Sequence, residues 1–398
     1  MKSKNRLPKN IPAVRRVPHE EPVSCHMPLP VQGESDLRPG ALPGHPLSGL
    51  QRKCREVAMG NSFVDLMEQF QKGNKPAILP GPFLPLARIK ERGLPFNEIM
   101  KDPDAMTEAA LMSYELGFES AVLPFDLNVE AEILGATVRY HEGFDGHPVY
   151  PTIAQKPFTM DDDMNIPDSL IEKGRMPAIL KAIASIKEQA RGKGSLGVFI
   201  PGPFTLAGQV LDMEKLYRVL LKQPDKTRGI FDRLTAFISK LIAVYAGAGV
   251  DFMTIVDEGG ANISPETFRK LLLPCLREIF RPRGMHRIGL LFGKSETVVE
   301  FVLACDPDGV GLDRDCSIKK IQGRLPEGMP LFGECGAHDM LANATPAEIT
   351  EKVNRHLDMG FTTVSPAADI YPPAKNENIE AFVKALREYK GRVKRIQK

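Results

Sequence analysis

Short apolar runs alternate with longer segments of helical period from about residue 50 to the end of the chain. Eight runs lack any regular polar alternation: 77–79, 120–123, 197–200, 251–256, 288–292, 309–312, 330–332 and 362–364. A short apolar run of this kind is typical of a strand that is buried on both faces, as in a parallel sheet. The pattern therefore predicts eight parallel strands.

Three of the intervening segments have clear helix starts. At Asp102-Pro103, Ser264-Pro265 and Thr345-Pro346, a residue that can cap a helix precedes a proline at the first helical position. A last amphipathic helix is predicted over 378–389. Eight strands alternating with helices favour a (β/α)8 TIM barrel. A doubly wound open sheet is the main alternative, but no G-x-G-x-x-G follows the first strand.

Two segments do not fit a plain barrel. Residues 1–48 are rich in proline, which fixes φ and removes a backbone donor, so helices and central strands are blocked. We expect this arm either to be disordered or to lie extended over the barrel domain, residues 49–398, or over a neighbouring subunit. Residues 135–187, after the second strand, are too long for a simple crossover and predict an insertion over the barrel mouth.

The composition of the chain mainly excludes classes of partner and of membrane protein. The chain has 398 residues, a net charge of +2, 42% hydrophobic and 26% charged residues, as in an ordinary globular protein. This balance gives no indication of a nucleic-acid or membrane partner. The six cysteines show no C-x-x-C spacing, and no apolar run reaches the roughly 18 residues of a spanning helix. The expected location is the cytoplasm.

Carboxylates follow several predicted strands, where the chemistry of a barrel collects. Asp126 follows the second strand, Asp257 and Glu258 the fourth, and Asp369 the eighth. These four are the expected catalytic residues, as general acids or as groups that orient substrate. Asp257 and Glu258 are adjacent, so at most one of them points directly into a pocket. The alternative for these carboxylates is a capping or loop role.

Other strand-end residues suggest how a substrate or a metal could be held. The expected substrate-binding residues are Phe83, Phe125, Phe204, Phe292, Lys294 and Tyr371. The aromatic residues would line an apolar pocket, and Lys294 would hold an anionic group or cap a turn. Glu334, Cys335 and His338 are a less favoured metal-binding set, because their spacing matches no common zinc pattern.

Several of these segments, taken together, resemble the uroporphyrinogen decarboxylase superfamily. The matching segments occur in the same order along the chain: 125–126, 130–135, GPFTLA at 202–207, 248–257, 264–265, 273–274 and 372–379. The resemblance covers about residues 50–390 and implies a (β/α)8 barrel, in agreement with the strand count.

The superfamily contains tetrapyrrole decarboxylases and methyltransferases that work with a corrinoid protein. The decarboxylase pattern has an arginine-rich RQAGR segment after the first strand, where this chain has GPFLPLAR at 81–88. Without those arginines a polyanionic substrate would lack its main partners. Residues 115–135 and the chain's ending resemble the methyltransferase branch more closely.

Many methyltransferases of this branch bind zinc through His-x-Cys on the fifth strand and Cys on the eighth. Zinc makes a thiol acceptor into a nucleophilic thiolate. The corresponding positions here are Leu290, Phe292 and Ala368. The resemblance therefore implies no bound zinc at these positions and argues against thiol methylation.

The sequence predicts an enzyme that moves a methyl group between a small methylated compound and the cobalt of a corrinoid (cobalamin) carried by a partner protein. The preferred donor is a methoxylated aromatic, which would make the reaction an O-demethylation. Its leaving oxygen must be protonated, because a phenolate with a parent pKa of about 10 leaves poorly. Asp257, Glu258, Asp369 or Tyr371 could supply that proton. A tetrapyrrole decarboxylase and a non-catalytic corrinoid- or tetrapyrrole-binding protein are the alternatives.

Overall fold

The computed structural model describes residues 63–72, 75–79, 84–143, 148–192, 194–258, 262–281, 284–291, 293, 296–314, 316–337, 339–367 and 369–391. The predicted arm over residues 1–48 lies outside the described residues, so it stays a prediction. Within the described part, no helix combines the length and the apolar character needed to cross a bilayer.

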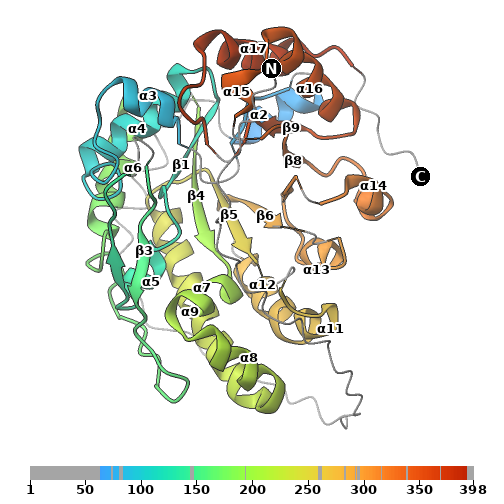
Figure 1. The fold of residues 1–398 in the computed structure, drawn as a ribbon. Coiled ribbons are helices and arrows are strands. Elements are labelled where there is room, and N and C mark those ends of the chain that lie inside the picture. Colours follow the sequence, from blue (N-terminus) through green and yellow to red (C-terminus); the bar gives the residue numbers. More distant parts are fainter. Residues whose placement is uncertain are drawn as a thin grey trace, which may run out of the picture. The chain divides into compact units, whose positions relative to one another are not determined.

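A curled parallel sheet forms the centre of the fold (Figure 1). Its seven strands are β1 (Ser120–Leu123), β4 (Ser195–Pro201), β5 (Phe252–Asp257), β6 (His286–Leu291), β7 (Gly309–Leu312), β8 (Leu331–Glu334) and β9 (Thr363–Ser365). Each strand pairs in parallel with the next one along the chain. Because this order never reverses, the sheet lacks the switch point of a doubly wound fold. The predicted TIM-barrel class is confirmed.

The first of the eight predicted strands, 77–79, is the exception. The segment is buried but is not a strand, because side chains take its backbone donors: Leu79 N–H donates to Ser120 Oγ at 2.7 Å. At the other edge of the sheet, the N–H of Ala87 donates to the carbonyl of Ile370, beyond β9, at 2.9 Å. An irregular segment thus occupies the eighth position of the barrel, between β1 and the chain after β9.

Helices surround the sheet, and one of them, α2, closes its N-terminal end. They are α2 (Phe63–Gln71), α3 (Leu86–Glu91), α4 (Pro103–Glu115), α5 (Val129–Ile133), α6 (Met176–Ala190), α7 (Pro203–Val210), α8 (Met213–Lys222), α9 (Pro224–Gly247), α11 (Pro265–Thr267), the π-helix η1 (Phe268–Leu272), α12 (Leu273–Ile279), α13 (Val299–Leu303), α14 (Ile318–Ile321), the 3-10 helix η2 (Gln322–Arg324), α15 (Met340–Asn343), α16 (Pro346–Asp358) and α17 (Asn376–Glu388).

The three predicted helix starts are confirmed by their caps. The Asp102 side chain accepts from the N–H groups of Asp104 and Ala105 at 3.0 and 2.9 Å, at the start of α4. Ser264 caps α11 in the same way, and Thr345 forms a capping box at the start of α16. The predicted last helix is α17, which begins two residues earlier than expected and ends one residue earlier.

Helix α2 closes the N-terminal end of the sheet. The ring of Phe63 lies 5.1 Å from that of Phe252 and 4.8 Å from that of His286, both at the start of their strands. These two residues therefore point into the barrel. Since side chains alternate along a strand, Leu290 of β6 also points inward, toward the opposite end. That opposite end, where the strands terminate, is the mouth.

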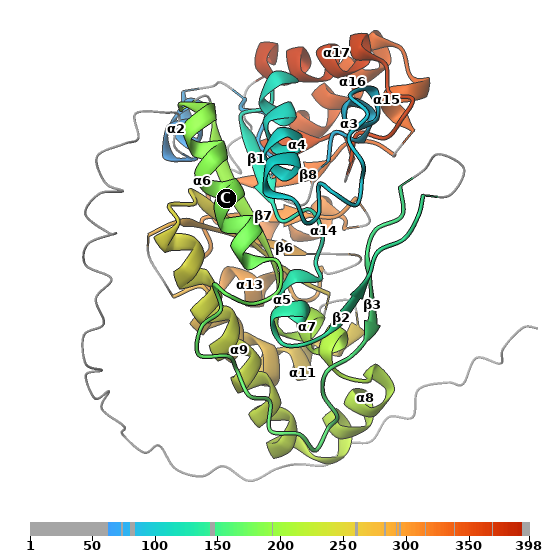
Figure 2. The ribbon, with the colours of Figure 1, turned by 90° about the vertical axis from the view of Figure 1, so that its left-hand side faces the viewer.

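The segment after β1 and α5 contains a separate antiparallel hairpin, β2 (Thr137–Arg139) and β3 (Thr152–Gln155). Figure 2 shows this hairpin outside the main sheet. The loop end of the hairpin, just before β3, is tied to the chain that follows β1, because Asn128 Nδ2 donates to the carbonyl of Pro151 at 2.7 Å.

Candidate active site

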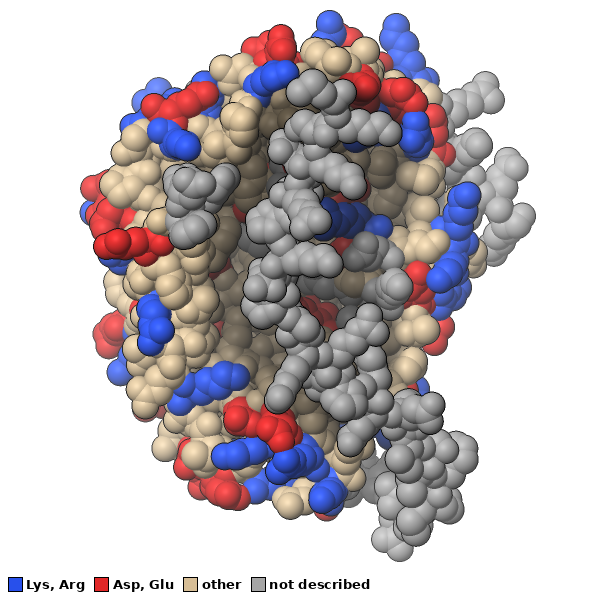
Figure 3. Space-filling view, in the orientation of Figure 1, with Lys and Arg blue, Asp and Glu red and all other residues tan. Residues whose placement is uncertain are grey.

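The strand register brings the predicted strand ends to one edge. Asp257 is paired with Leu291, and Glu334 is paired with Ser365, so β5, β6, β8 and β9 end at similar heights. Figure 3 shows one face of the molecule, with Lys, Arg, Asp and Glu side chains visible along its rim.

Asp257 and the glycine before α7 form one structural unit. Helix α7 has no capping side chain of its own at Gly202. Instead, Oδ2 of Asp257, from the neighbouring strand β5, accepts the N–H of Phe204 at 3.0 Å. Asp257 is 6% exposed. The carboxylate therefore caps α7 from the neighbouring strand. This bond links Asp257 directly to the GPFTLA segment, which contains Phe204.

Glu258, the next residue along the chain, is directed to the opposite face of the sheet from Asp257. Its backbone N–H donates to Thr205 Oγ1 at 2.9 Å and its carbonyl accepts from Asn262 at 2.9 Å, while its side chain is exposed. Burial, and then the Glu258 charge, raise the pKa of Tyr217 on α8, which places that tyrosine within electrostatic range. Of the two adjacent carboxylates, Asp257 is buried and Glu258 is exposed.

Substituting alanine for Gly202 is expected to disturb this unit. A Cβ there would lie 2.4 Å from Oδ2 of Asp257 and 2.6 Å from its Cβ. Such overpacking costs typically about 1–3 kcal/mol, and we expect the loss to appear as a lower urea midpoint. Gly229→Ala is the control: it lies within α9, where a Cβ meets nothing within 4 Å, so it should be neutral or stabilising. Equal midpoints for the two variants would contradict the close approach.

Asp126 forms an ion pair with Arg175, a residue that lies outside the family motifs. Nη1 of Arg175 lies 2.6 Å from Oδ2 of Asp126, and Nη2 lies 3.0 Å from Oδ1. Nε of Arg175 bonds Glu132 at 2.7 Å. Burial lowers the pKa of Arg175, but the bonds and charges of Asp126 and Glu132 outweigh this effect and raise it above its ordinary value. Arg175 and Asp126 are a buried, bidentate ion pair.

Glu130 lies beside this pair and is fully buried. Neither of its carboxyl oxygens has a hydrogen-bond partner within the described residues. Burial raises the pKa of Glu130 to about 8, and the nearby charge of Asp126 adds to this. Its own backbone amide and the charge of Arg175 act in the opposite direction but do not compensate. The carboxyl group is therefore protonated at neutral pH.

Asp369 joins three segments of the mouth. Its Oδ1 accepts the N–H of Leu84 at 2.7 Å, and its Oδ2 accepts the hydroxyl of Tyr150 at 2.7 Å. Tyr371 also hydrogen-bonds to this carboxylate. Burial raises the pKa of Asp369 despite these donors. Burial and the Asp369 charge together raise the pKa of Tyr371 to about 12.

The expected substrate-binding residues differ in where they lie. Phe125 and Phe204 are 3% and 2% exposed, so both are core residues in this conformation. Tyr371 is half-buried at the mouth. Phe83, Phe292 and Lys294 lie outside the described residues.

The less favoured metal set is only partly described. Glu334 ends β8 and is half-buried, and burial raises the pKa of the Cys335 thiol to about 12, so that thiol is protonated. His338 lies outside the described residues. Within the described part of the chain, no group of three His, Cys, Asp or Glu side chains has metal-binding geometry.

The residues at the three positions that the resemblance assigns to zinc do not fit that metal. Leu290 points into the barrel and lies over Gly311, where a Cβ would come within 2.5 Å of its Cδ1. An isobutyl group has no lone pair to donate. Phe292 and Ala368 lie outside the described residues, but neither side chain carries a ligating atom.

Arg175, Glu130 and Tyr150 are the main residues of these clusters that sequence reasoning missed as functional groups. Glu130 stands inside a matching motif, and Tyr150 stands in the predicted insertion, but only the fold brings them beside Asp126 and Asp369. An arginine preceding a helix has no local signal that identifies its partners.

Comparisons with known proteins settle the family. The sequence model of Uroporphyrinogen decarboxylase (URO-D) matches residues 62–389. The chain belongs to this family. The family and the resemblance to its methyltransferase branch, both predicted from the motifs, are confirmed.

Curated relatives come from both branches. A methylated-thiol–coenzyme M methyltransferase of Methanosarcina mazei is 27% identical over 72% of this chain and 77% of its own length. The methylcobamide:CoM methyltransferase MtaA of Methanosarcina barkeri is 24% identical, over 76% and 89%. A uroporphyrinogen decarboxylase of Syntrophotalea carbinolica is 24% identical, over 69% and 82%.

A solved structure supports the fold. A methyltransferase from Methanosarcina mazei superposes with a TM-score of 0.74 at 22% identity, covering 82% of this chain and 99% of its own. At this identity the likeness concerns the fold alone.

Proposed function

We propose that this chain is an enzyme that transfers a methyl group between a small methylated compound and the corrinoid of a partner protein. The relatives named as methyltransferases match it over most of both lengths, which supports this branch. The observation that carries the choice is the Arg175–Asp126 pair. Asp126 is the position to which the decarboxylase's catalytic aspartate would map, and here both its oxygens are bound by an arginine in the interior. The decarboxylase alternative is therefore less favoured.

The methyl donor that we propose is a methoxylated aromatic. The carbon–oxygen bond breaks, the methyl group passes to the reduced cobalt brought by the partner protein, and the bonding electron pair stays on the aryl oxygen. That oxygen needs a proton, because phenolate is a poor leaving group. The corrinoid supplies the methyl acceptor, and the chain supplies the binding site and the proton.

Glu258 is the group that we propose to deliver the proton. Asp257 caps α7 and Asp369 accepts from two tyrosines and a backbone amide, so both are committed to structure. Glu258 presents an exposed carboxyl group at the end of β5. An aromatic donor bound over it would exclude water from this carboxyl group and would place the ether oxygen within reach of its proton.

The activity is tested by mixing the full chain, a reduced corrinoid protein and candidate methyl ethers. Methylation changes the corrinoid absorption spectrum, and demethylated phenol should appear in equal amount. No spectral change with any methyl donor would refute the proposed function. Corrinoid-protein binding without turnover would instead support the non-catalytic alternative, and metal analysis of the same sample would test for zinc or a relocated metal.

Glu258→Gln is expected to lower the rate of methyl transfer from an aryl ether by about 100-fold. General acid catalysis contributes typically about 10²–10⁴, and glutamine keeps the size of the side chain while it cannot donate the acidic proton. Single-turnover kinetics of the corrinoid spectrum would measure this loss. The control is Glu214→Gln, an exposed residue of α8 that pairs with Arg218, whose rate should match the wild type. An equal rate for Glu258→Gln would remove Glu258 from the mechanism.

A further inference from the structure

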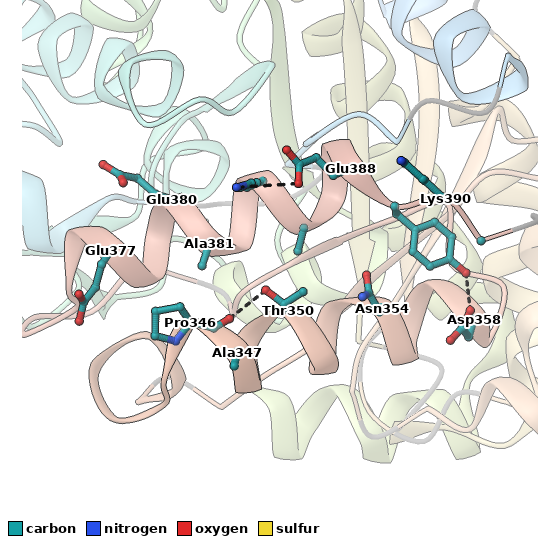
Figure 4. A pocket seen from close by; sticks show the side chains of 14 residues that line it. Pro346, Ala347, Thr350, Asn354, Asp358, Glu377, Glu380, Ala381, Glu388 and Lys390 are labelled. Atoms are coloured by element: carbon teal, nitrogen blue, oxygen red, sulfur yellow. Dashed lines mark hydrogen bonds and ion pairs between the residues drawn. The ribbon is translucent and has the colours of Figure 1, made fainter.

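A polar groove, the α16–α17 groove, runs between the last two helices of the fold (Figure 4). The helices lie side by side and point the same way, so that Pro346 and Glu377 are at one end of the groove. Asp358 and Lys390 are at the other end. The groove has a volume of about 770 Å³, and much of its lining consists of small side chains: Ala347, Thr350, Ala381 and Ala385.

At the Asp358 end of the groove, the carboxylates have partners. Asp358 accepts a hydrogen bond from the hydroxyl of Tyr389. On the facing helix, Oε2 of Glu388 lies 4.0 Å from Nζ of Lys384. The negative charge at this end is therefore already engaged.

At the opposite end, Glu377 and Glu380 line the groove and are exposed. Neither of them forms an ion pair with another residue of the described part of the chain. They are three residues apart in α17, so their side chains share one face of the helix, and like charges placed in this way repel each other. A cation bound at this end would stabilise both carboxylates.

The chain reaches the Asp358 end of the groove after α17. Lys390 and Gly391, which follow the helix, both line the groove. A side chain at Gly391 would clash with the hydroxyl of Tyr389, so the backbone passes directly against that ring. The next seven residues, 392–398, lie outside the described residues, and their sequence, RVKRIQK, has four cationic side chains and no acidic one.

Residues 392–398 are long enough to run back along the groove. Positions 377 and 388 are eleven residues apart in α17, which corresponds to about 16 Å of helix. Seven residues in an extended conformation span up to about 23 Å, at about 3.3 Å each. The cationic side chains of this segment can therefore reach Glu377 and Glu380.

We propose that residues 392–398 lie in the α16–α17 groove of the same chain and that their cationic side chains pair with Glu377 and Glu380. The segment runs antiparallel to α17, and its apolar residues Val393 and Ile396 cover the small side chains of the lining. This docking requires neither a substrate nor the corrinoid protein.

The docked segment would hold α17 where the barrel closes without a strand. Helix α17 packs against the chain just before β1, because the rings of Phe118 and Phe382 have centroids 6.3 Å apart. Nη2 of Arg387 also donates to the carbonyl of Gly117 at 2.8 Å. Strand β1 borders the irregular segment 77–79, so fastening α17 to α16 supports this part of the barrel.

Tryptic digestion of the full chain tests the docking, because a segment that is held in a groove must leave it before a protease can cleave it. Cleavage after Arg395 releases residues 396–398, which mass spectrometry quantifies. A synthetic peptide of residues 388–398 with a heavy-isotope label in Ile396 is digested in the same tube. Its labelled product gives the cleavage rate of the free segment under identical conditions.

At about 0.1 M salt, release from the chain should be about three- to tenfold slower than release from the peptide, the range for two exposed ion pairs together. At about 1 M salt, where the Debye length falls to about 3 Å, the two rates should agree within about twofold. The double variant Glu377→Gln with Glu380→Gln keeps the side-chain size and removes both charges. It should therefore be cleaved at the rate of the peptide at either salt concentration.

Glu214→Gln with Glu266→Gln is the matched control, because it changes the net charge by the same amount. Both glutamates are exposed and pair with a cation four residues further along the chain. They lie on α8 and α11, on the opposite side of the view in Figure 1 from α16 and α17. This variant should keep the protection of the wild type.

Three results would overturn the proposal. Equal rates for the chain and the peptide at low salt would mean that water alone fills the groove. Undiminished protection in the Glu377→Gln, Glu380→Gln variant would mean that other contacts hold the segment. Protection that disappears when the protein is diluted would mean that a second copy supplies the segment. The two salt conditions use the wild type, so they decide the matter even if the double variant does not fold.

Discussion

Arg175→Met is expected to lower the free energy of unfolding by about 3–5 kcal/mol, the range for removing one partner of a buried ion pair. Arg175 and Asp126 have side chains that are 6% and 3% exposed, so water cannot replace the lost partner. In the variant the Asp126 carboxylate stays in the interior and still accepts the backbone N–H of Asn128 at 2.8 Å, but it has lost its cation. The cost is mainly the unpaired charge and not the net value of the pair.

Urea unfolding at pH 7 measures this loss as a lower midpoint with an unchanged slope. Arg218→Met, at an exposed pair on α8, is the control and should change stability by less than about 0.5 kcal/mol. The double variant Asp126→Asn with Arg175→Met removes both charges, so it should recover part of the loss. If Arg175→Met is no more destabilising than Arg218→Met, the Arg175–Asp126 contact does not act as a buried ion pair.

The predicted strands show how much of the fold could be derived from the sequence alone. Apolar runs predicted β1 and β7 with their correct bounds, because a strand buried on both faces consists mostly of apolar residues. The run 77–79 has the same composition but is not a strand, because Glu119 and Ser120 bind its backbone donors through their side chains. Composition cannot distinguish a backbone ladder from bonds to side chains.

Strand ends were sufficient to place Asp126, Asp257, Glu258 and Asp369 around one mouth, because the register of a parallel barrel fixes where strands end. Their individual roles depended on partners from distant segments. Arg175 is 49 residues from Asp126, and Tyr150 is 219 residues from Asp369. Such pairs arise from how the insertion folds back, and no local pattern encodes them.

Glu130→Gln is expected to change how stability depends on pH. Burial raises the pKa of Glu130 from its ordinary value of 4.5 to about 8 in the folded chain. Between these values the folded state keeps a proton that the unfolded state releases, so the unfolded state binds fewer protons and stability falls as the pH rises. Each pKa unit corresponds to about 1.4 kcal/mol, so the wild type should lose roughly 2–3 kcal/mol through this group between pH 5 and 7.

Glutamine cannot ionise, so the variant lacks this loss. Urea unfolding of both proteins at pH 5, 6, 7 and 8 isolates the effect, because the other titrating groups largely cancel in the difference. The stability of Glu130→Gln relative to the wild type should rise by roughly 2–3 kcal/mol from pH 5 to 7 and level off above the folded pKa. Parallel curves would mean that Glu130 is already ionised in the folded state. In that case the Arg175 charge, and not desolvation, dominates its surroundings, and the buried cluster holds one cation against three carboxylates.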